Sequence, residues 1–105
     1  MNHFITLNEL ALHELIKDGF VGSVQTENLT VAYTDIKAGV EIPLHQHTEE
    51  AVDIIVDGKL EMQIGEATNT LSYGMISIVP SNISHRAKAI SDCKVITIFY
   101  PKRHM

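Results

Sequence analysis

Short apolar runs separated by turn residues make up most of this chain from residue 20 onward. Apolar and polar residues alternate within several of them, which is typical of half-buried β-strands because residues two apart face the same side of a sheet. The runs are FVGSVQT (20–26), LTVAYTDI (29–36), AVDIIV (51–56), KLEMQI (59–64), ATNTL (67–71), MISIVP (75–80), HRAKAI (85–90) and KVITIFY (94–100). Many short strands with turn residues between them predict an all-β sandwich or barrel.

Two joints between these runs carry specific turn signals. Asp57-Gly58 lies between two apolar runs and predicts a tight hairpin, because a type I′ turn needs positive φ at both central residues. Asn82 follows Pro80 where the turn favours positive φ, and Asn adopts that conformation more readily than most other residues.

The first nineteen residues have a different pattern. Leucines at 7, 10, 12 and 15 precede Gly19, and this spacing predicts one or two helical turns that lead into the sheet. Neither an internal repeat nor a flexible linker divides the chain. We therefore expect one domain over residues 1–105, with a lead-in over about 1–19 and a barrel over about 20–101.

Composition narrows the function classes. The 105 residues carry a net charge of −5, and the eight Lys and Arg residues are scattered, so no basic patch for nucleic acid is expected. The longest apolar runs are far shorter than the roughly 20 residues that span a membrane. The N-terminus has no secretory leader pattern, and Cys93 is the only cysteine, which fits a reducing compartment. We expect a cytoplasmic protein that binds neither nucleic acid nor membranes.

The candidate chemistry begins at His45 and His47. In a strand these two imidazoles project to the same side and can share a metal ion, although a His-x-His pair alone is a weak signal. His85 begins a later strand, just after the turn at Asn82, and is a candidate third ligand.

The stretches around these histidines resemble the two signature motifs of the cupin family. The matching residues are Gly39, His45, His47 and Gly58 in the first motif, and Gly74, Pro80 and His85 in the second, where Asn82 replaces a Gly and Ala89 an Asn. The resemblance implies a jelly-roll barrel (a double-stranded β-helix), commonly a homodimer. It also implies one divalent metal ion at the barrel mouth, held by His45, His47 and His85. Its identity stays open among zinc, nickel, iron and manganese.

Ala51 occupies the position where the family has a fourth ligand, a Glu. We rank a three-histidine site completed by water first, ligation by Glu49 second and ligation by Asp53 third. Asp53 has inward parity but lies about 6.6 Å further along the strand, which favours a place beside the ion. Without the carboxylate, the ion keeps its full positive charge and favours anionic or chelating ligands such as α-keto acids.

The second half of the chain resembles a group of small single-domain cupins that includes the pectin-degradation enzyme opening 4,5-unsaturated uronates. That resemblance implies that Phe99 and Arg103 line the substrate pocket, with Arg103 binding a carboxylate. The enzyme's pocket Asp corresponds to Thr97, which cannot transfer a proton as Asp does. We therefore name Asp53, Arg103 and Phe99 as catalytic candidates. The alternatives are an exposed tail arginine and a plain core phenylalanine.

These features favour a metal-dependent enzyme that isomerises or opens a small carboxylated or sugar-derived compound. A three-histidine iron dioxygenase is the second possibility among enzymes. A non-catalytic barrel that binds or senses a small ligand is the alternative outside enzymes, and a metal-free structural barrel is the third. The absence of the family's Glu, and Thr97 in place of an Asp, favour ligand binding without catalysis. The three histidines and Arg103 favour a catalytic site.

Overall fold

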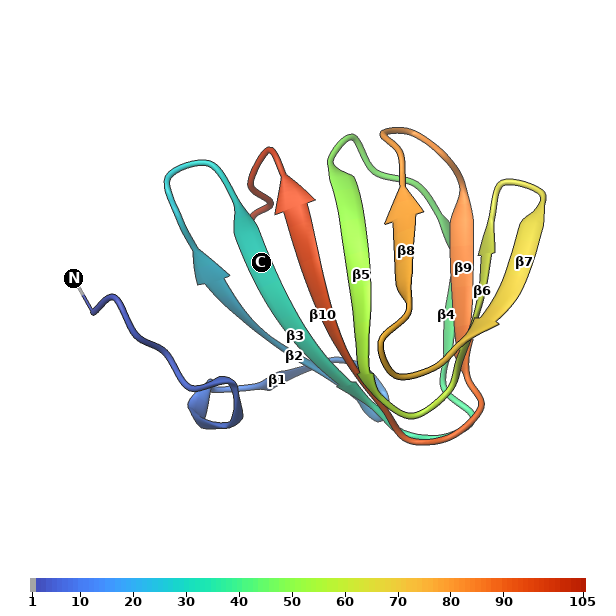
Figure 1. The fold of residues 1–105 in the computed structure, drawn as a ribbon, viewed down its shortest axis with the longest axis horizontal. Helices are drawn as coiled ribbons and strands as arrows, with labels where there is room; N and C mark the ends of the chain where they lie inside the picture. The colour runs from blue at the N-terminus through green and yellow to red at the C-terminus, as the bar shows by residue number, and fades with distance from the viewer. Residues whose placement is uncertain (1) are drawn as a thin grey trace.

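The computed structural model describes residues 2–105, which form strands connected by turns, with a single 3-10 turn near the N-terminus (Figure 1). The strands within this range are β1 (His13–Ile16), β2 (Gly19–Gln25), β3 (Thr30–Ile36), β4 (Glu41–His45), β5 (Glu50–Asp57), β6 (Leu60–Ile64), β7 (Ala67–Leu71), β8 (Ile76–Val79), β9 (His85–Ala89) and β10 (Cys93–Tyr100). The 3-10 helix, η1, covers Leu7–Glu9. Within residues 2–105, no helix has the length and apolar character needed to cross a membrane.

The strands form two antiparallel sheets that face each other (Figure 1). The six-stranded sheet has the order β1-β2-β3-β10-β5-β8, and the four-stranded sheet has the order β4-β9-β6-β7. From β3 onward the chain changes sheet at almost every connection, which is the arrangement of a jelly roll. The predicted all-β jelly-roll barrel is confirmed.

The core lies between the two sheets, and strict alternation along β5 and β10 decides which side chains enter it. Along β10, Cys93, Val95, Thr97 and Phe99 are buried, whereas the residues between them are half-buried on the outer face. The largest fully buried apolar side chains are Ile55, Val21 and Val79. Burying a side chain of this size stabilises the fold by roughly 1.5–3 kcal/mol.

The hairpin predicted at Asp57-Gly58 is wrong. Only Gly58 has a positive φ (86°), and the strands on either side, β5 and β6, belong to different sheets. The chain passes from one sheet to the other here, close to a neighbouring turn. A Cβ at position 58 would clash with the carbonyl oxygen of Asp92, so the glycine provides space as well as backbone freedom. The positive φ predicted for Asn82 is confirmed at 62°.

The lead-in contains one helical turn, the lower end of the prediction, and it is a 3-10 turn. After the single turn of η1, the chain extends and forms β1, which pairs with β2. Residues 10–12 lie against Gly22 of β2, where a Cβ would come 2.8 Å from Leu12 Cδ2. An isolated short helix is marginal in water, and pairing with the exposed edge of β2 is the better use of this segment.

Candidate metal centre

The three candidate histidines come from two adjacent strand ends. His45 ends β4, and its direct cross-strand neighbour is His85, the first residue of β9. His47 lies in the loop after β4, and its carbonyl oxygen accepts a hydrogen bond from the Asn82 N–H at 2.8 Å. The positive-φ turn at Asn82 therefore ties the loop that carries His47 to the strand that carries His85.

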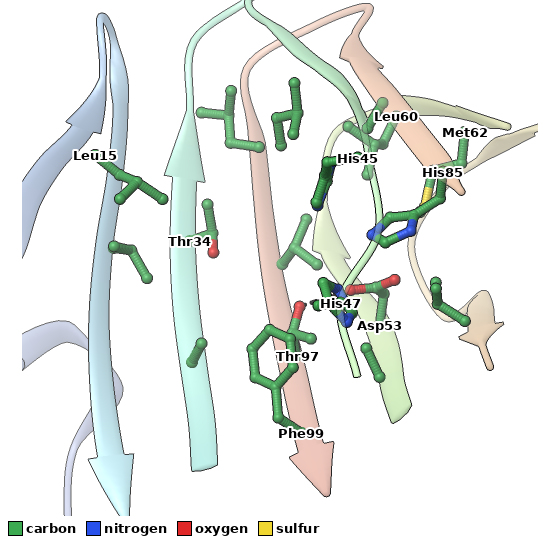
Figure 2. Close-up of a pocket in the computed structure, with 18 of the residues that line it drawn as sticks. Leu15, Thr34, His45, His47, Asp53, Leu60, Met62, His85, Thr97 and Phe99 are labelled. Carbon is green, nitrogen blue, oxygen red and sulfur yellow. Dashed lines mark hydrogen bonds between the residues drawn. The ribbon is translucent and has the colours of Figure 1, made fainter. Parts of the chain in front are cut away.

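The imidazole rings converge. Their centroids lie 4.2 Å apart for His45 and His85, 4.7 Å for His47 and His85, and 5.6 Å for His45 and His47. One ring nitrogen from each residue falls within 4.8 Å of the others. Figure 2 shows the rings gathered at one side of the cavity. His85 is buried, His47 half-buried and His45 exposed, so the cluster has both a protein side and a solvent side.

Backbone carbonyls fix how the rings are presented. In each ring Nδ1 lies 2.8–2.9 Å from a backbone oxygen: Pro43 O for His45, Glu49 O for His47 and Ile83 O for His85. Because a carbonyl only accepts, Nδ1 carries the proton in each ring, and in the neutral imidazole Nε2 then has the free lone pair. Burial lowers the pKa of His85, which further favours the neutral imidazole that a metal requires.

This donor set fits a divalent metal ion. Neutral imidazoles anchored through Nδ1 are the usual form of histidine ligands, and they suit zinc, nickel, iron or copper. Of the carboxylates considered as a fourth ligand, neither Glu49 nor Asp53 belongs to the group of side chains close enough to share the ion. The histidines thus occupy one side of the site and leave the cavity side open to an exogenous ligand.

Glu49 is engaged elsewhere. Its Oε1 accepts a hydrogen bond from Arg103 Nη1 at 2.8 Å. The backbone N–H of Glu49 and the Arg103 guanidinium lower the pKa of this carboxyl, so it is charged at neutral pH. The Arg103 guanidinium also lies over the Phe99 ring, 5.6 Å from its centroid.

Arg103 is not a free tail residue. Its backbone N–H donates a hydrogen bond to Thr30 Oγ1 at 2.8 Å, and its carbonyl oxygen accepts one from the Gln25 side-chain amide at 2.8 Å. These bonds hold the C-terminal segment against the end of the β2–β3 hairpin. The guanidinium is consequently placed at the rim of the same cavity as the histidines.

Asp53 points into the barrel, as its parity predicts, and is 9% exposed. Its two carboxylate oxygens accept hydrogen bonds from the Thr97 hydroxyl (2.6 Å) and the Ser77 hydroxyl (2.9 Å). Both donors are neutral, so hydroxyl groups rather than a Lys or Arg stabilise this buried carboxylate.

Ser77 belongs to the site but was not predicted from the sequence, although the sequence contains an indication of its buried position. It is the one polar residue in the apolar run MISIVP, at a position with the same parity as buried Val79. A lone hydroxyl at an inward position of a strand generally has a buried partner, and here that partner is Asp53.

The histidines, Asp53, Thr97, Phe99 and Arg103 line one cavity of about 190 Å³. Phe99 is 9% exposed and forms part of the wall, with its ring edge-on to His47 at a centroid distance of 5.6 Å. Ala51 is buried in this wall, where its methyl group leaves open the space that a longer ligand side chain would occupy.

The sequence profile described as Cupin domain matches residues 32–99, more than half of the chain. The chain belongs to the cupin family. The predicted family is confirmed, and its histidine motifs are the cluster described above.

Three relatives bear on what this cupin resembles. The uncharacterized protein SCO3923 of Streptomyces coelicolor is 26% identical over 97 residues, covering 90% of this chain and 92% of that protein. The H2HPP isomerase of Bacillus subtilis is 26% identical over 87 residues, covering 71% of this chain but only 37% of that protein. The structure of KdgF from Halomonas sp. superposes with a TM-score of 0.91 at 24% identity, covering 98% of this chain and 96% of that one. The last likeness establishes a shared fold.

Proposed function

We propose that this cupin is a metal-dependent enzyme that isomerises or opens a small carboxylated or dicarbonyl compound. The observation that carries the proposal is the set of three Nδ1-anchored imidazoles facing a cavity that also contains a carboxylate and a guanidinium. The partial likeness to an H2HPP isomerase supports isomerisation as the reaction class. Unsaturated uronates are the first sugar-derived compounds to test, because of the resemblance to the small uronate-opening cupins.

Each residue has a role in this proposal. When bound to His45, His47 and His85, a divalent metal supplies Lewis-acid polarisation of a carbonyl or enolate oxygen. Arg103 binds the substrate carboxylate through the guanidinium N–H groups that Glu49 does not use. Asp53 takes a proton from the carbon next to the carbonyl and returns it elsewhere, while Phe99 forms the adjoining wall.

Two other functions remain testable at the same site. A three-histidine iron dioxygenase requires iron and consumes oxygen with its substrate. If the protein is a non-catalytic sensor, its ligand should raise the melting temperature of the protein and should not be converted to a product. We prefer isomerisation because Asp53 is a buried carboxylate inside the cavity, a feature that a sensor does not need.

The homodimer forms part of the proposal. On the outer face of the six-stranded sheet, Ile76 and Ile78 of β8 are 58% and 60% exposed. They continue two apolar cross-strand rows whose other members are Ile54 and Ile96, and Val52 and Ile98. A partly exposed apolar face of this kind suits a two-fold pairing with a second copy. Ile78→Asp should shift the protein from dimer to monomer in sedimentation. We also place it in the cytoplasm, where Cys93 remains a free thiol.

The first experiment measures metal content by mass spectrometry on untagged protein. About one equivalent per chain is expected, lost in His45→Ala/His85→Ala and retained in His13→Ala/His104→Ala, which alters two exposed histidines outside the cluster. Anaerobic turnover of unsaturated uronates and small 2-oxo acids then follows on the loaded protein. Failure to bind any divalent metal after reconstitution would overturn the proposed function.

A further inference from the structure

Most polar groups of the cavity lie in one layer of the barrel. In the six-stranded sheet, the inward-facing cross-strand row Ala32–Thr97–Asp53–Ser77 carries the hydroxyls and the carboxylate. In the opposite sheet, His45 and His85 are paired. His45 ends β4 and His85 begins β9, and the β4–β5 and β8–β9 loops lie at the same end of the barrel (Figure 1).

The next layer inward is almost entirely apolar. The adjacent row of the six-stranded sheet is Val21–Thr34–Val95–Ile55, and the adjacent row of the four-stranded sheet is Ile42–Ala87–Met62. In Figure 2, Leu15 and Thr34 lie on the side of the cavity away from Asp53 and His85. Among the members of these two rows that line the cavity, only Thr34 has a polar side chain.

The apolar layer continues into a second hollow of about 70 Å³, between β1, β2, β3 and β4. The two hollows share five wall residues: Leu15, Val21, Thr34, Ile36 and Ile42. The cavity next to the three histidines therefore continues, away from them, between mainly apolar side chains.

We infer that the ligand of this site has a charged, chelating head and an apolar body, namely a 2-oxo carboxylate carrying a hydrocarbon ring or branched chain. This inference rests on the proposed function and narrows its substrate. The head lies at the three histidines and Arg103, and the body lies against Val21, Ile42 and Val95.

Size and hydrogen bonding both favour this ligand over a polyhydroxylated sugar acid. An apolar cavity of about 150 Å³ holds benzene, so the space of about 190 Å³ here accommodates a six-membered ring next to a short head. A sugar body would bring several hydroxyl groups into the second layer, where only Thr34 offers a side-chain partner. Each unpaired hydroxyl would lose its hydrogen bonds to water without replacement.

The test compares three probes that share one head and differ in the body: pyruvate, phenylpyruvate and 2-ketogluconate. Calorimetric titration of the metal-loaded protein should show phenylpyruvate binding at least tenfold more tightly than pyruvate. 2-Ketogluconate should bind no more tightly than pyruvate. Tighter binding of 2-ketogluconate than of phenylpyruvate, or equal binding of all three probes, would overturn the inference and leave the metal-binding head site intact.

A substitution in the apolar wall of the cavity tests where the hydrocarbon body of the ligand binds. Ile42→Ser, at a half-buried position of the second layer, should remove most of the preference for phenylpyruvate while pyruvate binds as before. Ile90→Ser is the matched control, because Ile90 is 49% exposed and outside the cavity. An unchanged preference in Ile42→Ser contradicts the assigned place of the body. If none of the probes binds the loaded protein, this inference fails, whereas the proposed function fails only if the protein takes up no divalent metal.

Discussion

Asp53 of β5 and Thr97 of β10 are direct cross-strand neighbours, and the Thr97 hydroxyl donates a hydrogen bond to Asp53 Oδ1 at 2.6 Å. The resemblance to the small uronate-opening cupins implies a carboxylate at the position of Thr97. Here a carboxylate stands opposite that position, one strand spacing of about 4.8 Å away. Both side chains face the same cavity, so this chain has a carboxylate there on β5 and a hydroxyl on β10.

The first prediction exchanges these two residues. Asp53→Asn should lower kcat/KM by about 10²–10⁴-fold on the compound that the loaded protein converts, since the amide cannot transfer the proton. The exchange Asp53→Thr/Thr97→Asp should recover at least tenfold over Asp53→Thr alone. Metal content, measured in parallel, should not change. Full activity in Asp53→Asn would remove Asp53 from the mechanism.

Thr97→Val tests the hydrogen bond itself. The substitution keeps the side-chain shape and removes the hydroxyl donor to a buried carboxylate, so the free energy of unfolding should fall by about 1–3 kcal/mol. Urea denaturation measures the change. Thr68→Val on β7, an exposed position, is the control and should shift stability by less than about 0.5 kcal/mol. Equal effects at both positions would mean that the Thr97 hydroxyl contributes nothing specific.

Glu49→Gln should free Arg103 for a ligand carboxylate. The variant keeps the size of the side chain and removes its charge, so pyruvate should bind the loaded protein severalfold more tightly. The exposed Glu50→Gln, next in the chain, is the control. Weaker pyruvate binding in Glu49→Gln would show that Glu49 assists the ligand instead of competing with it. The partly exposed ion pair itself contributes only about 0.2–1 kcal/mol to stability.

The same variant should change the response to acid. Because the folded-state pKa of Glu49 lies below its ordinary value of 4.5, its contribution to stability is present above pH 4.5 and is lost as the pH falls through the folded-state pKa. Wild type should therefore lose more stability than Glu49→Gln on acidification below pH 4.5. Parallel acid curves would contradict the lowered pKa.

Gly58→Ala should destabilise the barrel more than Gly39→Ala. Both glycines have positive φ, at 86° and 87°, so both variants strain the backbone by about 1–2 kcal/mol. Only at position 58 would the new Cβ also meet a carbonyl oxygen, that of Asp92, whereas nothing lies within 4 Å at position 39. The difference between the two unfolding free energies isolates the close approach. Equal values would show that the neighbouring turn yields without cost.

Cys93 should react with iodoacetamide only through unfolding. It is 0% exposed, and burial raises the pKa of its thiol above 9.0, the ordinary value. Above pH 9.0 the unfolded chain releases this proton and the folded chain retains it, so stability should fall as the pH rises beyond that value. The fall should be shallower in Cys93→Ala. Rapid labelling under native conditions would contradict the burial.

The strands could be predicted from the sequence because alternation is a local property. Eight segments between residues 20 and 100 carried it, and the inward parity of Asp53 followed from the same period of two. Two strands were not predicted. β4 contains Pro43 and exposed residues on both faces. The leucine spacing before and within β1 predicts a helix, but β1 pairs with the edge of β2. These two segments are extended because each pairs with another strand, and not because of a local sequence pattern.

The candidate metal ligands were predictable as residue types at a spacing, since His45, His47 and His85 belong to recognisable motifs. Their proton positions were not predictable, because the carbonyls that anchor each Nδ1 take their direction from the folded loops. The bonds between Glu49 and Arg103 and between Asp53 and Thr97 join residues 54 and 44 positions apart. The chain alone carries parity and chemistry; which groups meet, and which wall of the cavity is apolar, depends on how the two sheets close around the core.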